Sequence, residues 1–193
     1  MKLVYCFVLI ILSLVTINAT ADDYVIDNKG MHASIQFKIS HLGYSWLWGR
    51  FNDFNGSFSY DKNKPETSTI EVIINPGSVD SNHAERDKHL RGKKFLDVEK
   101  YPQAKFVSTS FTQNEDGTGI LKGDFTLHGV TKPITINVMY IGEGKDPWGG
   151  YRIGFEGTSK IALADFGIIK NLGPASKELD LIFAIEGVRK STK

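Results

Sequence analysis

The chain has 193 residues, of which 23 are lysine or arginine and 22 are aspartate or glutamate, so its formal net charge is +1. This length suffices for one domain with a single hydrophobic core. The charge balance leaves no basic surplus, which argues against nucleic-acid binding and gives no indication of an anionic-membrane partner.

The N-terminus has the pattern of a cleavable secretory signal peptide. Lys2 precedes an apolar run from Leu3 to Ile17, and small residues follow at positions 19–21. A membrane anchor is the alternative, but the run is shorter than the ~20 residues that a spanning helix needs. We therefore expect a signal peptide at residues 1–21 and an exported domain at residues 22–193. Cleavage would remove Cys6, the only cysteine, so the exported domain would fold without disulfides.

Apolar and polar residues alternate along most of the exported chain, with the period of a β-strand. The alternating segments are residues 33–39, 48–60, 70–74, 104–108, 120–127, 134–140, 151–163 and 179–185. Segment 151–163 is clearly longer than the usual strand of about five or six residues. Long antiparallel strands joined by short turns predict an extended eight-stranded barrel, with a β-sandwich as the alternative.

One segment departs from this period and predicts a short helical excursion at about residues 82–97. Residues 82–85 (NHAE) have the arrangement of a capping box, with Asn82 as the N-cap and Glu85 three residues later. We expect a short helix that ends near Gly92. An apolar group at residues 95–98 then fits a segment folded over one end of the barrel.

Six sequence blocks, spread in order across the exported chain, carry a resemblance to a known family. They are HLGYSWLWG at 41–49, NHAERDKHLR at 82–91, KYPQA at 100–104, LHGVTKP at 127–133, DPWGG at 146–150 and LGPAS at 172–176. Together they resemble the bacterial YceI-like family, and in particular its periplasmic members. The resemblance implies a periplasmic, lipocalin-like barrel whose elongated cavity holds a polyisoprenoid or similar long amphiphile. An isoprenoid quinone, a prenyl-phosphate type lipid and a fatty amide all fit that class, and no further cofactor is implied.

If the barrel is hollow, its inward-facing apolar residues form the wall of the binding site. We expect this wall to consist of Phe37, Ile39, Trp48, Phe54, Phe58, Phe106, Phe125, Leu127, Phe155 and Phe183. The alternative is a solid core. Three small residues, Gly56, Gly157 and Ser159, share the inward-facing side of their strands with these large residues and favour a tapering tunnel. Small residues also allow the strands of an ordinary barrel to bend.

The head group of such a ligand would lie at the barrel mouth. His41, Tyr44 and Trp46 combine polar tips with apolar bodies, which suits a cavity lip, and simple packing of a turn is the alternative. Arg86 and Arg91 are the expected polar contacts to the head group. Their alternative is surface ion pairing with the acidic residues of the same helix.

Metal binding and catalysis receive little support from the sequence. His83, Glu85, Asp87 and His89 resemble a ligand set, but helical spacing pairs each histidine with a carboxylate four residues away, and no H-E-x-x-H pattern occurs. We therefore expect local ion pairs and no metal. There is no G-x-S-x-G elbow and no phosphate-binding glycine loop, so we expect no enzyme activity.

The sequence thus predicts a periplasmic protein that sequesters a long-chain isoprenoid or fatty-amide-like lipid. Two alternatives stay open at this stage. One is an envelope-stress or interaction protein with a solid barrel, and the other is an accessory that delivers a quinone to a membrane electron-transfer protein. A membrane donor or acceptor protein and a homodimer are further open partners, while nucleic acid is not expected.

Overall fold

The computed structural model describes residues 21–191, so residues 1–20 of the expected signal peptide lie outside the described residues. The strands are β1 (Asp22–Ile26), β2 (Ser34–His41), β3 (Ser45–Phe51), β4 (Phe54–Tyr60), β5 (Thr69–Ile74), β6 (Val79–Asp80), β7 (Ala104–Gln113), β8 (Thr118–Leu127), β9 (Val130–Lys145), β10 (Tyr151–Ala162) and β11 (Glu178–Arg189). The helical segments are α1 (Ala84–Arg91), η1 (Pro65–Thr67), η2 (Pro76–Ser78), η3 (Leu163–Phe166) and η4 (Pro174–Ser176).

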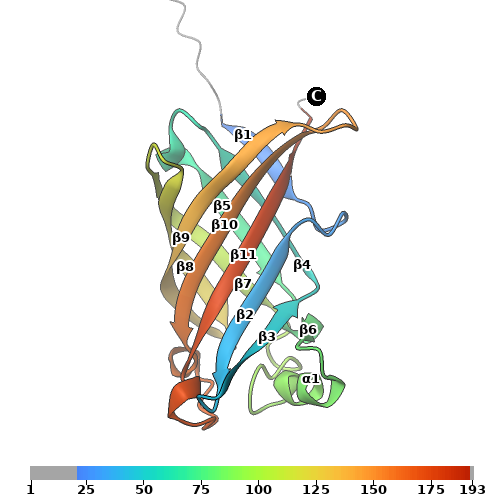
Figure 1. Cartoon of the computed structure of the whole chain (residues 1–193), viewed down its shortest axis with the longest axis vertical. Coiled ribbons are helices and arrows are strands. Elements are labelled where there is room, and N and C mark those ends of the chain that lie inside the picture. The colour runs from blue at the N-terminus through green and yellow to red at the C-terminus, as the bar shows by residue number, and fades with distance from the viewer. Residues whose placement is uncertain (1–20, 192–193) are drawn as a thin grey trace, which may run out of the picture.

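These strands form a closed, extended, eight-stranded antiparallel barrel (Figure 1), as predicted. Three of the barrel strands are interrupted, so that β1 with β2, β3 with β4, and β5 with β6 each act as one bent strand. The seam shows this clearly, because β11 pairs with β1 through residues 187–189 and with β2 through residues 179–184. Closure gives each barrel strand a paired neighbour on both sides over at least part of its length.

The predicted helical excursion is present at one end of the barrel, where α1 lies beside β6 (Figure 1). His83, and not Asn82, is the N-cap, and its side chain accepts a hydrogen bond from Arg86 N at 3.2 Å. Asn82 has a left-handed φ of 62° and donates its backbone N–H to Asp80, so the helix begins one residue later than predicted. The expected pair of His83 with Asp87 is also wrong, because Asp87 is buried and accepts hydrogen bonds from Ser81.

A break at residues 52–53 reverses the parity of the predicted strand 48–60. Phe51 in β3 and Phe54 in β4 both point inward although three positions separate them. Asn52 N donates to Ser78 O, and Asp53 O accepts from Asn75 N, which fixes the break. Trp48 therefore faces outward, where it is 51% exposed, and its prediction as a wall residue is wrong. A single irregularity of this kind moves every side chain on one side of it to the other face of the sheet.

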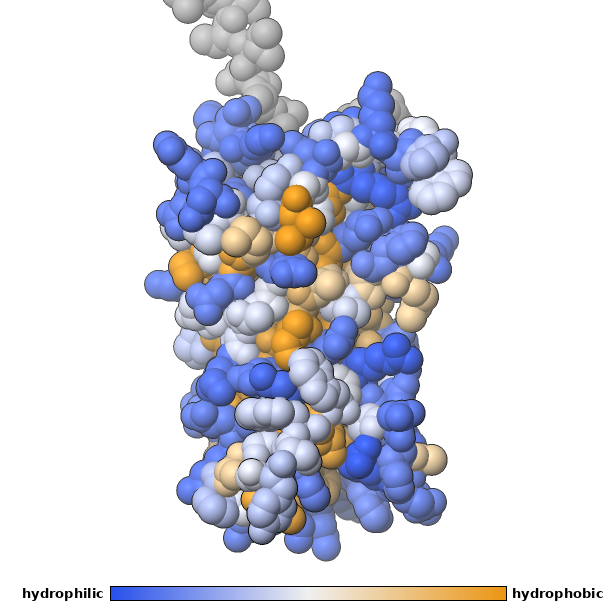
Figure 2. Space-filling model, viewed as in Figure 1, coloured by the Kyte–Doolittle hydropathy of each residue, from blue (hydrophilic) through white to orange (hydrophobic). Residues whose placement is uncertain are grey.

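The outside of the barrel is largely polar. Figure 2 shows charged and polar side chains over most of one face, with apolar side chains in small separate patches. No helix within residues 21–191 combines the length and the apolar character needed to cross a membrane.

Inside the barrel, three phenylalanine rings lie over glycines, two of them on a neighbouring strand and one on the next strand but one. A Cβ atom on Gly49 would lie 2.2 Å from Phe37 Cζ, where β2 and β3 pair. Phe106 covers Gly123 in the same way, with a corresponding distance of 2.4 Å. Phe58 of β4 covers Gly187 of β11 at the same distance, and its ring reaches past the intervening β1. The absent side chain gives the rings of Phe37 and Phe106 a place against the wall, so these two rings lie along it.

We predict that Gly49→Ala destabilises the protein by about 1–3 kcal/mol, because the new methyl group pushes the Phe37 ring off the wall. Gly142→Ala is the matched control, since a Cβ there meets no atom within 4 Å. Urea denaturation of both variants measures the free energy of unfolding. Equal stabilities for the two variants would show that the ring does not depend on the missing side chain.

Candidate functional site

The barrel encloses a cavity of about 1330 Å³. Its wall is made by inward-facing side chains of nearly every barrel strand, and most of them are aliphatic or aromatic. Members of the wall include Ile35, Phe37, Ile39, Phe51, Phe58, Ile70, Val72, Phe106, Leu121, Phe125, Leu127, Ile134, Ile136, Val138, Phe155, Ile161, Leu179, Leu181, Phe183 and Ile185. The cavity exceeds the roughly 300–1,000 Å³ of pockets that enclose drug-sized ligands. It is shaped by an elongated barrel, so it suits a long, slender apolar molecule.

Aromatic side chains fill the barrel at the end where β1 begins and β11 ends. Tyr24 stacks on Phe58 with ring centroids 5.0 Å apart, and Phe155 meets Tyr60 edge-on at 5.3 Å. Tyr60 also donates its hydroxyl hydrogen bond to Gln113 at 2.8 Å. Burial raises the pKa of the Tyr24 hydroxyl to about 12, and it also raises the pKa of the Tyr60 hydroxyl. The aromatic rings at this end are therefore packed against one another.

The cavity opens to solvent at the opposite end, beside α1. Several wall residues at that end are exposed: His41, Leu42, Lys88, His89, Lys93, Lys94, Lys170 and Asn171. They belong to the β2–β3 turn, to α1 and the residues that follow it, and to the connection between η3 and η4, all of which lie at the same end in Figure 1. We call this opening the mouth.

The mouth carries basic side chains without matching acidic ones. Lys88, Lys93, Lys94 and Lys170 all contribute to its wall, whereas Glu156 is the one acidic residue of the cavity wall within residues 21–191. None of the four lysines takes part in an ion pair with another described residue; the lysine ion pairs lie elsewhere on the barrel. An apolar bore that ends in an electropositive mouth can hold a molecule with a long apolar tail and a polar or anionic head.

Comparison with known proteins decides the family. The model of the YceI-like domain matches residues 24–187. The chain belongs to the YceI-like family. A UPF0312 protein of Azotobacter vinelandii is 59% identical over 172 residues, which cover 89% of this chain and 90% of that protein. A UPF0312 protein of Ectopseudomonas mendocina is 58% identical over the same length, again covering 89% of this chain and 90% of its own.

Solved structures agree with this YceI-like fold. The Campylobacter jejuni YceI protein matches with a TM-score of 0.72 at 28% identity, covering 80% of this chain and 91% of that one. A domain from Saccharophagus degradans, described as polyisoprenoid binding, has the same fold with a TM-score of 0.64 at 17% identity. That match covers 86% of this chain and 98% of the domain.

Eight of the ten predicted wall residues of this YceI-like chain line the cavity: Phe37, Ile39, Phe58, Phe106, Phe125, Leu127, Phe155 and Phe183. Trp48 lies outside the barrel, as described above. Phe54 points inward and is 3% exposed, but it packs in the buried core beside the cavity and not on its wall. Gly56 does not widen the bore either, because the side chain of Ile26 occupies the space beside it.

The predicted mouth residues divide into two groups. His41 and Arg86 lie on the cavity wall, whereas Tyr44, Trp46 and Arg91 do not. Trp46 faces outward, where Lys38 Nζ lies 4.5 Å from the centre of its ring. Tyr44 is at the tip of the β2–β3 turn, which carries it away from the bore.

The two arginines of α1 are held by backbone and hydroxyl groups. Arg91 donates to Val79 O at 3.4 Å, and Arg86 donates through Nε to Ser81 Oγ at 2.7 Å. Arg86 also donates to Ser81 O. These bonds tie α1 to β6, so neither the expected head-group role of Arg91 nor its surface ion-pair alternative is found.

Sequence reasoning missed the residues that shape the mouth. Leu90, Phe95 and Leu96 contribute from the α1 segment, and the basic side chains named above surround them. Strand parity does not apply to a helix or to loops, so it gave no signal for these positions. The apolar group at residues 95–98 was the available indication, because apolar residues in an excursion need a surface to cover.

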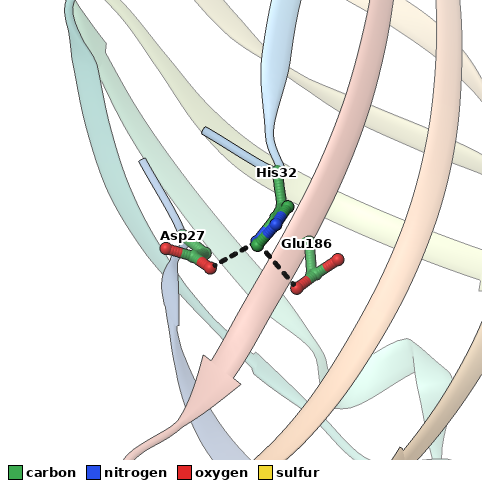
Figure 3. Close-up of side chains that lie close together, drawn as sticks. All are labelled: Asp27, His32 and Glu186. Atoms are coloured by element: carbon green, nitrogen blue, oxygen red, sulfur yellow. Dashed lines mark hydrogen bonds and ion pairs between the residues drawn. The ribbon is translucent and has the colours of Figure 1, made fainter. Parts of the chain in front are cut away.

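A second cluster of polar groups lies away from the cavity, where β1 leaves the barrel. Figure 3 shows His32 between Asp27 and Glu186, with His32 Nδ1 3.1 Å from Asp27 Oδ2 and 3.7 Å from Glu186 Oε1. The three side chains have the types and proximity that a metal ion could use. However, Arg152 Nη1 donates to the same two carboxylate oxygens, at 2.6 Å from Asp27, and Arg152 Nε reaches Asp146 at 2.8 Å. The guanidinium group occupies the position of a cation, so the cluster is an ion-pair network.

This network joins segments that are far apart in the sequence. Arg152 on β10 bonds to Asp27, 125 residues earlier, and thereby fixes the loop between β1 and β2 against β10 and β11. The hydrogen bonds from Arg152 and from Gly30 N lower the pKa of Asp27 to about 2. A carboxylate with a depressed pKa stabilises the fold above its ordinary pKa, and this contribution is lost as the pH falls toward the depressed value.

We predict that Asp27→Asn lowers the free energy of unfolding by about 2 kcal/mol near neutral pH. The difference from wild type should close as the pH falls from about 3.8 to about 2, because the wild-type carboxylate is protonated over that range. Urea denaturation at several pH values measures it, with the exposed Asp23→Asn as control. A difference that does not change with pH would exclude the ionic role of Asp27.

Proposed function

We propose that this protein binds one polyisoprenoid or similar long-chain amphiphilic lipid in its barrel and carries it through the periplasm. The observation that carries the proposal is the continuous apolar cavity that opens at one end. The polyisoprenoid-binding description of the Saccharophagus degradans domain supports the ligand class, and the N-terminal sequence pattern supports export. Binding and shielding from water constitute the whole activity, and no covalent step is proposed.

The size of the cavity sets the length of the tail. If one carbon with its hydrogens takes the ~30 Å³ of a liquid water molecule, about 1330 Å³ holds roughly 40 carbons, or about eight isoprene units. At ~0.8 kcal/mol per buried carbon, such a tail has a gross transfer free energy near 30 kcal/mol, above the ceiling of about 20 kcal/mol for non-covalent complexes. Ordering of the tail offsets much of this gain. The bore therefore selects tails by length and girth only coarsely.

Selection by chemistry falls to the mouth. An isoprenoid quinone and a prenyl phosphate present different heads, the first neutral and the second anionic. The four lysines of the mouth lack acidic partners among the described residues, so they favour an anionic head by direct Coulomb attraction. We therefore place prenyl phosphates ahead of quinones as ligands.

The alternatives from the sequence fare differently. An interaction protein with a solid barrel is inconsistent with a cavity of this volume. Delivery of a quinone to a membrane electron-transfer protein, a membrane donor or acceptor, and a homodimer stay predictions.

Extraction of the purified exported domain with organic solvent should release one long-chain lipid per protein molecule, which mass spectrometry detects. Ile134→Trp should lower the yield severalfold, because its side chain fills the bore, while Met139→Trp on the outer face should not. The proposal fails if the wild-type protein is free of lipid and also refuses added prenyl lipids.

A second experiment tests the head group. We predict that a prenyl monophosphate binds about tenfold more tightly than the neutral prenol of equal tail length at low salt, and that the ratio falls at ~1 M salt. The double variant Lys93→Ala with Lys94→Ala should bring this affinity ratio close to one. Lys145→Ala, at the other end of the barrel, should leave the ratio unchanged. Calorimetric titration gives both affinities, and equal binding of the two lipids would refute the electrostatic role of the mouth.

A further inference from the structure

Three large apolar side chains around the mouth are largely exposed in the described chain. Tyr44 is 86% exposed, Ile169 is 83% exposed and Leu42 is 54% exposed. They come from two segments, the β2–β3 turn and the connection between η3 and η4. Neither Tyr44 nor Ile169 contributes to the cavity wall, so lipid binding inside the bore does not account for them.

These two segments are held together as one platform. Ser176 Oγ donates to Ser40 O at 2.6 Å, which joins η4 to the end of β2. Leu42 Cδ2 would lie 3.6 Å from a Cβ atom on Gly173, so the turn packs directly against the connection. The exposed apolar side chains are therefore carried on a braced surface at the end of the barrel (Figure 1).

Cations lie on the same end of the molecule. Lys93, Lys94 and Lys170 are exposed and contribute to the mouth wall, and none has an ion-pair partner within residues 21–191. The near-zero charge of the whole chain conceals this local excess. Exposed Tyr, Leu and Ile side chains with neighbouring lysines make up the composition that inserts into the head-group region of an anionic bilayer.

We propose that the mouth of the barrel docks on the surface of an anionic phospholipid membrane. Tyr44 and Ile169 insert at the level of the head groups, and the lysines contact lipid phosphates. The open end of the bore then faces the bilayer, so a lipid tail passes between membrane and cavity without crossing water. This matters because the free-energy cost of exposing the tail to water grows with every exposed carbon. This inference rests on the proposed lipid-binding function.

The arrangement of basic and apolar side chains at the mouth favours a bilayer as the partner that covers this surface. Apolar and basic side chains surround an opening through which a membrane lipid would move, and phospholipid phosphates supply the negative charge that the described residues do not. A partner protein or a second copy of this chain would also cover an apolar surface. The experiment below separates these cases.

The test is co-sedimentation of the exported domain with vesicles, using phosphatidylcholine alone and phosphatidylcholine mixed with phosphatidylglycerol. We expect about tenfold stronger binding to the anionic vesicles at low salt and loss of the difference at ~1 M salt. The combined variant Tyr44→Asp with Ile169→Asp should reduce that binding about tenfold. Ile141 lies on β9 and is 60% exposed, so Ile141→Asp is the matched control and should bind vesicles as wild type does.

Loading from detergent-solubilised prenyl lipid is measured in parallel, because it does not require a membrane. The docking variant should load as wild type does but should extract the same lipid from vesicles more slowly. Equal vesicle binding by wild type and docking variant would overturn the docking proposal while leaving lipid binding intact. A wild-type protein that sediments with vesicles but takes up no lipid would overturn the proposed function instead. A change of oligomeric state in the docking variant, measured by light scattering, would assign the surface to a second copy and would also overturn docking.

Discussion

The contact between a phenylalanine ring and a glycine on the neighbouring strand determines what this barrel can do. An eight-stranded barrel is just wide enough for its own side chains to fill it. Rings that projected across the bore would close it, whereas Phe37 over Gly49 and Phe106 over Gly123 lie along the wall. The same residues thus supply apolar area for the fold and leave apolar volume for a ligand.

The two ends of the barrel have different chemistry, and this difference gives the molecule a direction. Stacked and edge-on aromatic rings fill the end where β1 begins and β11 ends, and the Arg152 network fixes β1 and its loop to the barrel wall beside them. The other end has an apolar opening, and the lysines around it have no ion-pair partner within residues 21–191. A tail would enter from the basic end and stop against the aromatic end, which leaves the head group at the mouth.

Strand parity predicted most of the cavity wall, because alternation along a regular strand depends only on local sequence. It failed where the backbone is irregular, as at residues 52–53, since a break is set by hydrogen bonds to the distant residues Asn75 and Ser78. It could not find the lysines of the mouth, which lie in α1 and in loops. It also missed the partnership of Arg152 with Asp27, because a contact across 125 residues exists only after the sheet has closed.

A crystal structure of the exported domain with a long-chain prenyl phosphate tests the central claim most directly. Our account predicts continuous density for the tail from the mouth to Phe58 and Phe155, with the rings of Phe37 and Phe106 still flat against their glycines. Rings turned into the bore, with the lipid absent or confined to the outer surface, would contradict it.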